Sequence, residues 1–320
     1  MALYLVTGGA GFIGSHLATA LIKRGDRVRV LDNLSSGRME NFADFTVDGP
    51  GSGAQVEFVE GNITDREACK QAADGVVGAF HEAAQVSVPY SVEHPEESYE
   101  VNVMGTLRVL EAVRAAGANR VVMAASSAAY GESEVLPKEE SMVGDPVSPY
   151  ASGKLGGEHL MSVWGRCYGL KTVCLRYFNV FGPRQVDDSP YTGVIAIFVR
   201  ELLEGRSPKI FGDGEQTRDL TYVDNVVEVN LKAMDADLPP GTVINVGGGQ
   251  RITMNQLYTA IAEGLGSDLL AEHVPERPGD VRHSLASVAK AKELLDWTPS
   301  VDWREGLKHT LAWYRARFEQ

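Results

Sequence analysis

The sequence has few cysteines, no long apolar run and a deficit of positive charge, and each shortage excludes a class of protein. Its three cysteines, Cys69, Cys167 and Cys174, are odd in number and share no spacing that is typical of a metal site. A disulfide framework or a cysteine-ligated metal is therefore not expected. We expect three buried or half-buried structural thiols, and no metal.

Membranes and nucleic acids are also poor partners for this chain. No uninterrupted apolar stretch approaches the ~20 residues that a membrane-spanning helix needs. The 30 Lys and Arg residues face 43 Asp and Glu residues, a net charge of −13, so no broad positive field would attract nucleic acid or an anionic membrane. The chain passes from Met1 into strand-like residues without a basic leader, so we expect a cytoplasmic protein. An anionic ligand would have to be held by a few individual arginines.

Short apolar runs alternate with helical patterns through the first half of the chain. The predicted strands are residues 3–6, 28–31, 56–59, 76–80, 121–125 and 172–175. The predicted helices are residues 13–23, 66–73, 99–115 and 149–168, and the Gly, Asp, Ser and Pro of residues 41–54 predict a loop. Strands that alternate with helices imply right-handed crossovers and a parallel sheet covered on both faces. We therefore expect a Rossmann-type, doubly wound α/β fold.

After residue 176 the alternation weakens, which predicts a second and smaller α/β domain. We interpret residues 183–191 as a loop, 192–205 as a helix, 209–214 as a strand with a turn, 243–246 as a core strand, and 253–265 and 303–318 as helices. One helix and one strand of this part are expected to return to the first sheet.

A glycine-rich turn links the first strand to the first helix. Residues 7–14 read TGGAGFIG, and Gly8, Gly11 and Gly14 permit a tight turn, a close approach of backbone to pyrophosphate, and close packing of helix on strand. The helix N-terminus then offers free N–H groups and the positive end of its dipole to phosphates. A glycine triplet alone also fits an ordinary turn, but the strand–turn–helix context indicates a dinucleotide site.

An acidic residue ends the second strand, where the adenosine ribose of a dinucleotide would lie. Asp32 follows the turn by about 20 residues, and its carboxylate can accept hydrogen bonds from ribose hydroxyls. The same charge would repel a 2′-phosphate, which favours NAD over NADP. We expect the cofactor to contact several more residues at this edge: Phe12, Ile13, Asn33, Ser35, Ser36, Gly37, Asn62, Ile63, Ala83 and Ala84.

A tyrosine and a lysine lie four residues apart in the predicted helix 149–168, downstream of a strand that ends in Ser126. Tyr150 and Lys154 share one helix face, so the ammonium can approach the phenol. Bringing the phenol pKa from ~10 to neutrality requires a preference of ~4 kcal/mol for the phenolate, which Lys154 and a positive nicotinamide ring could supply. Tyr150 would then be a general base, with Ser126 hydrogen-bonded to the same oxygen. The alternative is an exposed Tyr–Lys pair without function.

Together these motifs resemble the extended short-chain dehydrogenase/reductase family, and the likeness runs nearly end to end. It rests on TGGAGFIG at 7–14, Ser126, YASGK at 150–154, RYFNVFGPR at 176–184, GDG at 212–214 and RPGD at 277–280. The resemblance implies NAD as cofactor and a nucleotide-diphosphate sugar as substrate. It also implies an NAD-binding domain of residues 1–176 plus about 221–247, and a nucleotide-sugar domain of residues 177–220 plus about 248–320.

The same resemblance implies roles for individual residues. Asn179, Arg218 and Arg277 would contact the diphosphate, and Asp280 the ribose of the substrate. Near the sugar and the nicotinamide we expect Ser87, Ser127, Tyr177 and Asn102. His81, at the end of the fourth strand, is expected to be structural.

The strand end before Tyr130 separates the chemistries of this family. Dehydratases resemble Thr-Asp-Glu-x-Tyr-Gly there, and decarboxylases carry a Glu two residues before the Tyr. Residues 126–131 read SSAAYG, without a carboxylate. A site of Tyr, Lys and Ser can move a proton and a hydride and little else, so the resemblance implies the UDP-hexose 4-epimerase branch, acting through a transient 4-keto sugar.

Sugar identity depends on one position after the RPGD motif. A bulky residue there can close the pocket to N-acetyl groups, and this chain has Ser284. We therefore expect UDP-GlcNAc and UDP-GalNAc to be accepted, as well as or instead of UDP-Glc and UDP-Gal. A UDP-glucuronate 4-epimerase, another nucleotide-sugar epimerase or dehydratase, and a non-catalytic NAD-sensing regulator are the alternatives. By resemblance, residues 96–115 and 149–168 would pair across a two-fold axis, so we expect a homodimer built around a four-helix bundle.

Overall fold

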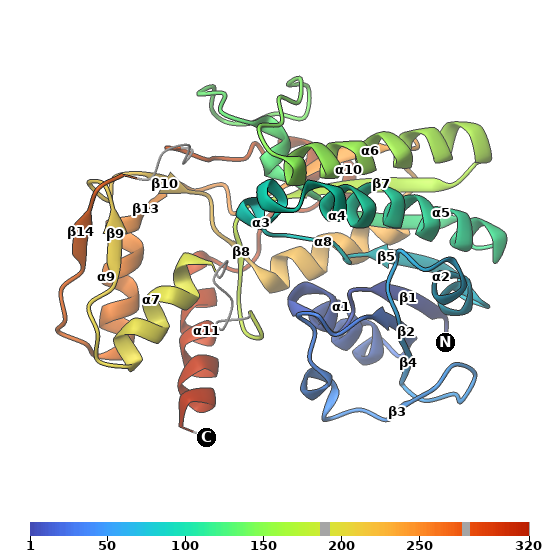
Figure 1. Cartoon of the computed structure of the whole chain (residues 1–320), viewed down its shortest axis with the longest axis horizontal. Coiled ribbons are helices and arrows are strands. Elements are labelled where there is room, and N and C mark those ends of the chain that lie inside the picture. The colour runs from blue at the N-terminus through green and yellow to red at the C-terminus, as the bar shows by residue number, and fades with distance from the viewer. Residues whose placement is uncertain (186–192, 277–281, 320) are drawn as a thin grey trace.

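The computed structural model describes residues 1–185, 193–276 and 282–319. In this part of the chain one parallel sheet of eight strands forms the centre of the larger body (Figure 1). In spatial order its strands are β12 (Thr242–Val246), β7 (Lys171–Tyr177), β6 (Arg120–Ser126), β5 (Gly78–His81), β1 (Leu3–Thr7), β2 (Arg27–Asp32), β4 (Val56–Glu60) and β3 (Val47–Asp48). The expected doubly wound sheet is confirmed, including the strand that returns to it from the C-terminal half.

The chain reverses direction across the sheet beside β1, which places a ligand crevice there. It runs from β1 outward through β2 to β4, and then crosses to β5 on the other side of β1. In doubly wound sheets ligands bind outside the carboxyl ends of the strands at this switch point. The loops that follow β1 and β5 therefore form the floor of the site.

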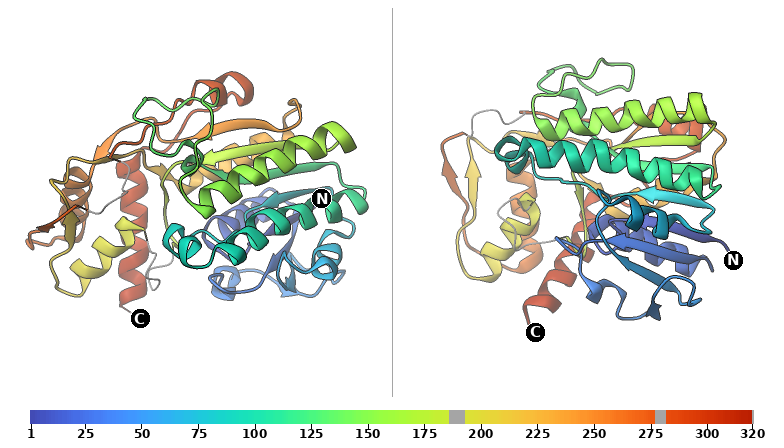
Figure 2. Two further views of the ribbon diagram at one scale, coloured as in Figure 1. Left: turned by 45° about the horizontal axis from the view of Figure 1, so that its top comes forward. Right: turned by 45° about the vertical axis from the view of Figure 1, so that its right-hand side comes forward.

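Helices cover both faces of the sheet, which explains why its strands are mostly apolar. One face carries α1 (Phe12–Lys23), α8 (Val223–Asp235) and α10 (Ala289–Leu295). The other carries α2 (Arg66–Ala73), α5 (Thr106–Ala115) and α6 (Pro149–Tyr168), with α5 and α6 side by side in Figure 2. Val6 and Val30 pack toward the first face and Leu5 and Leu31 toward the second, and all four are at most 1% exposed.

The C-terminal half builds a second hydrophobic core beside the carboxyl edge of the sheet (Figure 1). Its helices are α7 (Val194–Leu203), α9 (Met254–Leu265) and α11 (Trp303–Phe318), and its strand pairs are β9 (Lys209–Phe211) with β14 (Glu272–Val274), β10 (Thr217–Arg218) with β13 (Ile252–Thr253), and β8 (Val180–Phe181) with β11 (Thr221–Tyr222). Phe198, Leu257 and Leu311 bury their side chains between the three helices. Phe12 and Ile13, at the end of the glycine-rich segment, pack against this core.

Three sequence expectations about elements are corrected. Residues 41–54 are not entirely loop, because Val47–Asp48 pairs with β4, and a two-residue strand is too short for a periodic pattern. Residues 99–115 are not one α-helix: α4 (Pro95–Tyr99) leads into a π-helical stretch (Glu100–Gly105) before α5. The strand expected at 76–80 lies at Gly78–His81. A further short helix, α3 (Val88–Glu93), was not expected.

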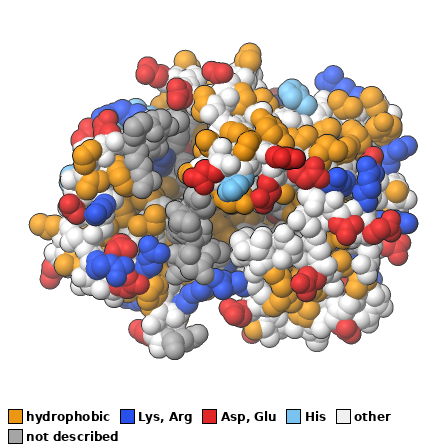
Figure 3. All heavy atoms as spheres, in the orientation of Figure 1, with side chains coloured by type: hydrophobic (Ala, Val, Ile, Leu, Met, Phe, Trp, Pro, Cys, Tyr) orange, Lys and Arg blue, Asp and Glu red, His pale blue; other side chains and the backbone are white. Residues whose placement is uncertain are grey.

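All three cysteines are free; Cys69 and Cys174 are buried, but Cys167 is exposed on α6, contrary to expectation. None of the helices in the described ranges has the length and apolar character to cross a membrane. On the face drawn in Figure 3, Lys and Arg side chains lie in small groups among Asp and Glu.

Candidate functional site

A cavity of about 1120 Å³ occupies the crevice at the carboxyl edge of the sheet. Its walls come from the segments that follow β1, β2, β4, β5, β6 and β7, from the start of α6, and from residues 218, 283 and 284. The predicted residues that line it are Gly8, Gly11, Phe12, Ile13, Gly14, Asp32, Asn33, Ser35, Ser36, Asn62, Ile63, Ala83, Ala84, Ser87, Ser126, Ser127, Tyr150, Lys154, Tyr177, Asn179, Arg218 and Ser284. The structure thus brings together residues that are up to 276 positions apart, from Gly8 to Ser284.

Four predicted residues are not placed in this wall. Gly37 lies behind it, where a Cβ would meet the carboxylate of Asp32 at 2.8 Å. Asn102 is 3% exposed and also lies behind the wall. Arg277 and Asp280 lie outside the described residues.

The turn after β1 is shaped so that only glycine fits at two of its three predicted positions. Gly8 has φ +65, and a Cβ on it would lie 2.7 Å from the backbone nitrogen of Ala83. A Cβ on Gly14 would lie 2.2 Å from the carbonyl oxygen of Gly8. Helix α1 begins immediately after Gly11 without a side-chain cap and without an acidic residue in its first turn. Its N–H groups are therefore available to phosphates.

The carboxylate of Asp32 is held rigidly at the end of β2. It accepts hydrogen bonds from the backbone N–H of Ala10 at 2.9 Å and of Leu34 at 2.8 Å. Burial raises the pKa of Asp32, and these hydrogen bonds oppose the change. A carboxylate has about four acceptor positions, so lone pairs remain for ribose hydroxyls. The turn and Asp32 together fit the pyrophosphate and the adenosine ribose of NAD.

The Tyr–Lys pair is positioned by the first turns of α6. The hydroxyl of Ser148 caps the helix by accepting from the N–H of Ala151, and Pro149 occupies the first helical position. Tyr150 lines the cavity, and Lys154 donates from Nζ to the carbonyl of Ala124 on β6 at 2.9 Å. Ser126, at the end of that strand, hydrogen-bonds the phenol of Tyr150. The three predicted catalytic residues therefore converge at one corner of the cavity.

The expected lowering of the phenol pKa is not provided by the protein's own groups. Burial raises the pKa of Tyr150, and the hydrogen bond with Ser126 opposes the rise only in part. Burial lowers the pKa of Lys154 to about 8, against the attraction of Glu82 and Glu158. The ammonium of Lys154 donates one hydrogen bond to the carbonyl of Ala124 and interacts with the carboxylates of Glu82 and Glu158.

A carboxylate that the sequence reasoning missed lies in the same corner. Glu82 follows β5 directly, lines the cavity, and accepts a hydrogen bond from Tyr177 Oη at 3.0 Å. Burial raises its pKa to about 7, while the Tyr177 hydroxyl and the charge of Lys154 lower it. The sequence contains a signal for Glu82, because an acidic residue directly after a buried strand at the ligand edge is a candidate site residue. Glu82 therefore adds a carboxylate to the corner for which the sequence predicted Tyr150, Lys154 and Ser126.

Two buried polar residues support the loop after β5 from behind. Asn102 accepts from the N–H of Gln85 and donates to its carbonyl, both at 3.0 Å, which pins the loop to the π-helical stretch. His81 is sandwiched between Thr7 Oγ1 at 2.8 Å and Thr106 Oγ1 at 2.9 Å. Burial lowers the pKa of His81 to about 3, so the ring is neutral and structural, as expected.

The far wall of the cavity is organised by the buried carboxylate of Asp219. It accepts from the backbone N–H of Gly248 at 2.7 Å and Ala286 at 2.8 Å, and burial raises its pKa to about 6. Ser284 Oγ accepts from the N–H of Asp219 at 3.1 Å and from Asn179 Nδ2 at 3.3 Å. Ser284 is thus part of the wall that orients Asn179.

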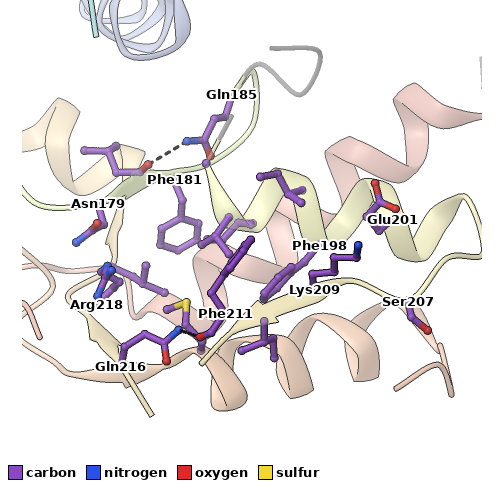
Figure 4. Close-up of a pocket in the computed structure, with 18 residues that line it drawn as sticks. Asn179, Phe181, Gln185, Phe198, Glu201, Ser207, Lys209, Phe211, Gln216 and Arg218 are labelled. Atoms are coloured by element: carbon purple, nitrogen blue, oxygen red, sulfur yellow. Dashed lines mark hydrogen bonds between the residues drawn. The ribbon is translucent and has the colours of Figure 1, made fainter. Parts of the chain in front are cut away.

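A second cavity of about 600 Å³ adjoins the first through Asn179 and Arg218, which line both. Figure 4 shows these two residues at one end, the rings of Phe181, Phe211 and Phe198 along the middle, and Lys209, Glu201 and Ser207 at the other end. The slot is apolar along its middle and meets the large cavity at the Arg218 end. It could hold a base and its sugar, with a negatively charged group near Arg218.

Lys138 is a second residue that the sequence reasoning missed. It is 3% exposed, lines the large cavity near Tyr130 and Gly131, and its ammonium donates to the carbonyl of Ser133. Burial lowers its pKa. Nothing in the local sequence marked Lys138, because the pairing of its backbone with residues 285–287 depends on the tertiary fold.

A dinucleotide cradle, a Tyr–Lys–Ser corner and a second slot across the crevice define an α/β protein for cofactor-linked chemistry on a nucleotide ligand. The model of the NAD dependent epimerase/dehydratase family matches residues 4–247. A UDP-glucose 4-epimerase of Mycolicibacterium smegmatis is 41% identical over 313 residues, which cover 97% of this chain and 98% of that protein. The chain therefore belongs to the NAD dependent epimerase/dehydratase family, and NAD is its cofactor.

Solved structures agree in fold over nearly the whole chain. The UDP-N-acetylglucosamine 4-epimerase from Methanobrevibacter ruminantium, in complex with UDP-N-acetylmuramic acid, has a TM-score of 0.92 at 38% identity and covers 99% of each chain. The UDP-glucose 4-epimerase of Thermus thermophilus, in complex with NAD, has a TM-score of 0.86 at 38% identity, and covers 98% of this chain and 99% of that one. The extended short-chain dehydrogenase/reductase resemblance is thereby confirmed.

Proposed function

We propose that this chain is an NAD-dependent 4-epimerase of UDP-hexoses. The observation that carries the proposal is the convergence of Tyr150, Lys154 and Ser126 in the cavity that also holds the phosphate cradle. Positions 127–129, where dehydratases and decarboxylases carry their acids, are Ser127, Ala128 and Ala129. The relatives named above are 4-epimerases, which supports the same chemistry here.

In the proposed mechanism Tyr150 takes the O4 proton of the sugar while C4 gives up a hydride. Ser126 hydrogen-bonds the phenol. Lys154 lines the same cavity one helical turn further along α6. When bound, oxidised NAD supplies the hydride acceptor and the positive ring that the phenolate needs. The 4-keto sugar then turns over, and the hydride returns to its other face while Tyr150 gives back the proton. The net redox change is zero, so bound NAD is recycled.

The mechanism requires a firmly held nucleotide and a loosely held sugar. We place the nucleoside in the slot lined by Phe181 and Phe211, and the diphosphate between Asn179 and Arg218, where the two cavities meet. Residues 1–176 plus about 221–247 would then bind NAD, and residues 177–220 plus about 248–320 the nucleotide sugar. Arg277 and Asp280 are proposed to complete the diphosphate and ribose contacts.

Product analysis of the purified protein, without added NAD, tests the proposed function. UDP-Glc and UDP-GlcNAc are supplied separately, and each is expected to reach equilibrium with its 4-epimer. Formation of a keto sugar, a pentose or a dehydrated sugar would instead indicate another chemistry. If neither substrate reacts even with NAD added, the NAD-sensing regulator becomes the better account.

Ser284 is the proposed determinant of acceptance of the acetamido group. Replacing Ser284 by Tyr adds a ring to the cavity wall, so turnover of UDP-GlcNAc is expected to fall at least tenfold more than turnover of UDP-Glc. Ser284→Ala is the matched control, because it removes the hydrogen bond to Asn179 without adding volume. Comparison of kcat/KM for both sugars in the two variants checks this. A Ser284→Tyr enzyme that keeps its UDP-GlcNAc turnover would show that Ser284 is no gate.

UDP-glucuronate is a second candidate substrate, and Lys138 is the observation that favours it. Its buried ammonium lies in the wall beside Tyr130, where a sugar carboxylate could find a cation. Turnover of UDP-glucuronate that is lost in Lys138→Met, with turnover of UDP-Glc kept, would favour this candidate.

A homodimer is proposed through α5 and α6, with the π-helical stretch before α5. Val163 and Tyr168 on α6 and Tyr99 at the end of α4 are 47%, 48% and 41% exposed, and a second copy of these helices could cover them. We expect sedimentation equilibrium to give the mass of two chains. Val163→Glu, which puts a charge on the exposed face of α6, should give the mass of one. A monomeric wild-type chain at micromolar concentration would contradict the proposal.

A further inference from the structure

Glu82 lies at the point where the cofactor and the catalytic corner meet. Its backbone N–H donates to the carbonyl of Thr7 at 3.2 Å, which ties it to the end of β1 beside the phosphate cradle. Its side chain lines the cavity together with Tyr150 and Lys154. The proposed mechanism gives this carboxylate no task.

The carboxylate is held in one orientation by a chain of hydrogen bonds. Asn230 on α8 donates from Nδ2 to Tyr177 Oη at 2.7 Å, and also to the carbonyl of Val226 at 2.8 Å. Because Tyr177 Oη accepts from Asn230, its own proton is directed to Glu82 Oε1 at 3.0 Å. Tyr177 is 8% exposed and Asn230 is fully buried, so the core of the protein fixes the position of Glu82.

The balance of charge in this corner depends on Glu82. Arg176 and Glu158 neutralise each other through two hydrogen bonds of 2.8 Å, from Nε and Nη2 to the two carboxylate oxygens. Lys154 is a buried cation. The charges of Glu82 and Glu158 both raise its pKa, and Glu82 has the larger effect. A second buried cation in the corner would be costly without this counter-charge.

The nicotinamide ring is that second cation only when it is oxidised. In the proposed placement Asp32 would hold the adenosine end of NAD, and hydride transfer from a carbon whose oxygen contacts Tyr150 would require the ring at the Tyr150 end of the cavity. Both Glu82 and Lys154 line that end. The oxidised ring carries one positive charge and the reduced ring none, so a fixed carboxylate there distinguishes the two forms.

We propose that Glu82 is a positioning residue that makes the site prefer oxidised over reduced cofactor, by supplying the counter-charge for the oxidised ring beside Lys154. The inference rests on the proposed placement of NAD and not on the identity of the sugar. It explains how the enzyme would keep its cofactor ready for the next substrate, because a site that retained NADH could not start a new cycle.

Competition between the two cofactor forms tests the proposal without any turnover. The purified protein is incubated at a pH between the pKa of about 7 of Glu82 and the pKa of about 8 of Lys154, with equal excesses of NAD and NADH, and is then desalted. Bound NADH is measured by absorbance and bound NAD by chromatography. Glu82→Gln is expected to shift the bound ratio toward NADH by about tenfold, the effect of one elementary charge in a partly buried site.

Two control variants separate this effect from others. Glu97→Gln removes an exposed acid from the wall of the same cavity, and is expected to leave the ratio unchanged. Glu82→Asp keeps the charge and should keep the ratio within about threefold of wild type. Should Glu82→Gln fail to fold, Tyr177→Phe removes the hydrogen bond that lowers the pKa of Glu82, and should shift the ratio in the same direction at pH 7.

A folded Glu82→Gln protein whose ratio stays within twofold of wild type would overturn the proposal. So would an equal loss of affinity for both forms, which would make Glu82 merely structural. Failure of the proposed function is distinguishable, because it would appear in the sugar products while this binding ratio still responded to Glu82.

Discussion

Replacing Tyr150 by Phe is expected to lower kcat for sugar epimerisation by about 10³-fold or more, while NAD remains bound. The phenol is the group that exchanges a proton with O4, and Phe keeps the ring that fills the cavity corner. General acid–base groups contribute about 10²–10⁴-fold to catalysis. Tyr150 acts as the base when it takes the O4 proton and as the acid when it returns it. Initial rates with saturating UDP-Glc, and the cofactor content of the same samples, check both halves of the prediction.

A matched series identifies the cause of that loss. Ser126→Ala removes one hydrogen bond to the phenol and is expected to cost about tenfold, clearly less than Tyr150→Phe. If Tyr150→Phe retained more than a tenth of the wild-type rate, another base would be carrying the proton and the assignment would be wrong. If it lost both rate and cofactor, its role would be to bind rather than to react.

Replacing Gly14 by Ala is expected to weaken NAD binding by at least about 100-fold, which makes it the largest expected effect on the cofactor. The added Cβ would lie 2.2 Å from Gly8 O and 2.8 Å from Gly9 Cα. Both atoms are backbone, so no side chain can rotate away, and the turn must move from the position that receives the pyrophosphate. Isothermal titration of NAD into the variant measures the loss.

Gly49→Ala is the control for this substitution. Gly49 lies on the surface with nothing within 4 Å of its would-be Cβ, and the variant should bind NAD like the wild type. Circular dichroism confirms that both variants are folded. Wild-type affinity in a folded Gly14→Ala protein would mean that the turn does not receive the cofactor.

The parts of the site that could be predicted from sequence are those encoded over short distances. Gly8, Gly11 and Gly14 lie within one segment of eight residues, and Tyr150 and Lys154 are one helical turn apart, so spacing alone placed them. Asp32 could be found because it ends an apolar strand that follows the turn. In a parallel sheet all such strand ends meet at one edge, which is why the cavity gathers them.

The parts that could not be predicted depend on contacts between distant segments. Asn102 was predicted to contact the cofactor, yet its side-chain amide hydrogen-bonds the backbone of Gln85. This contact depends on the packing of the π-helical stretch against the loop after β5. Lys138 enters the wall through backbone pairing with a segment almost 150 residues later. The pKa of Tyr150 was expected to fall under Lys154 and the nicotinamide ring together. In the protein alone burial raises it, and spacing does not show how deeply a group is buried.

Transfer of a C4 deuterium tests the central claim most directly. UDP-glucose labelled with deuterium at C4 is incubated with the purified enzyme, and the product is examined by mass spectrometry and NMR. If the C4 hydrogen leaves as hydride to bound NAD and returns to the opposite face, the 4-epimer keeps the deuterium at C4 with no exchange into water. A product that has lost its label to solvent would contradict the account, because the inversion would then proceed by proton abstraction at carbon rather than by oxidation at C4.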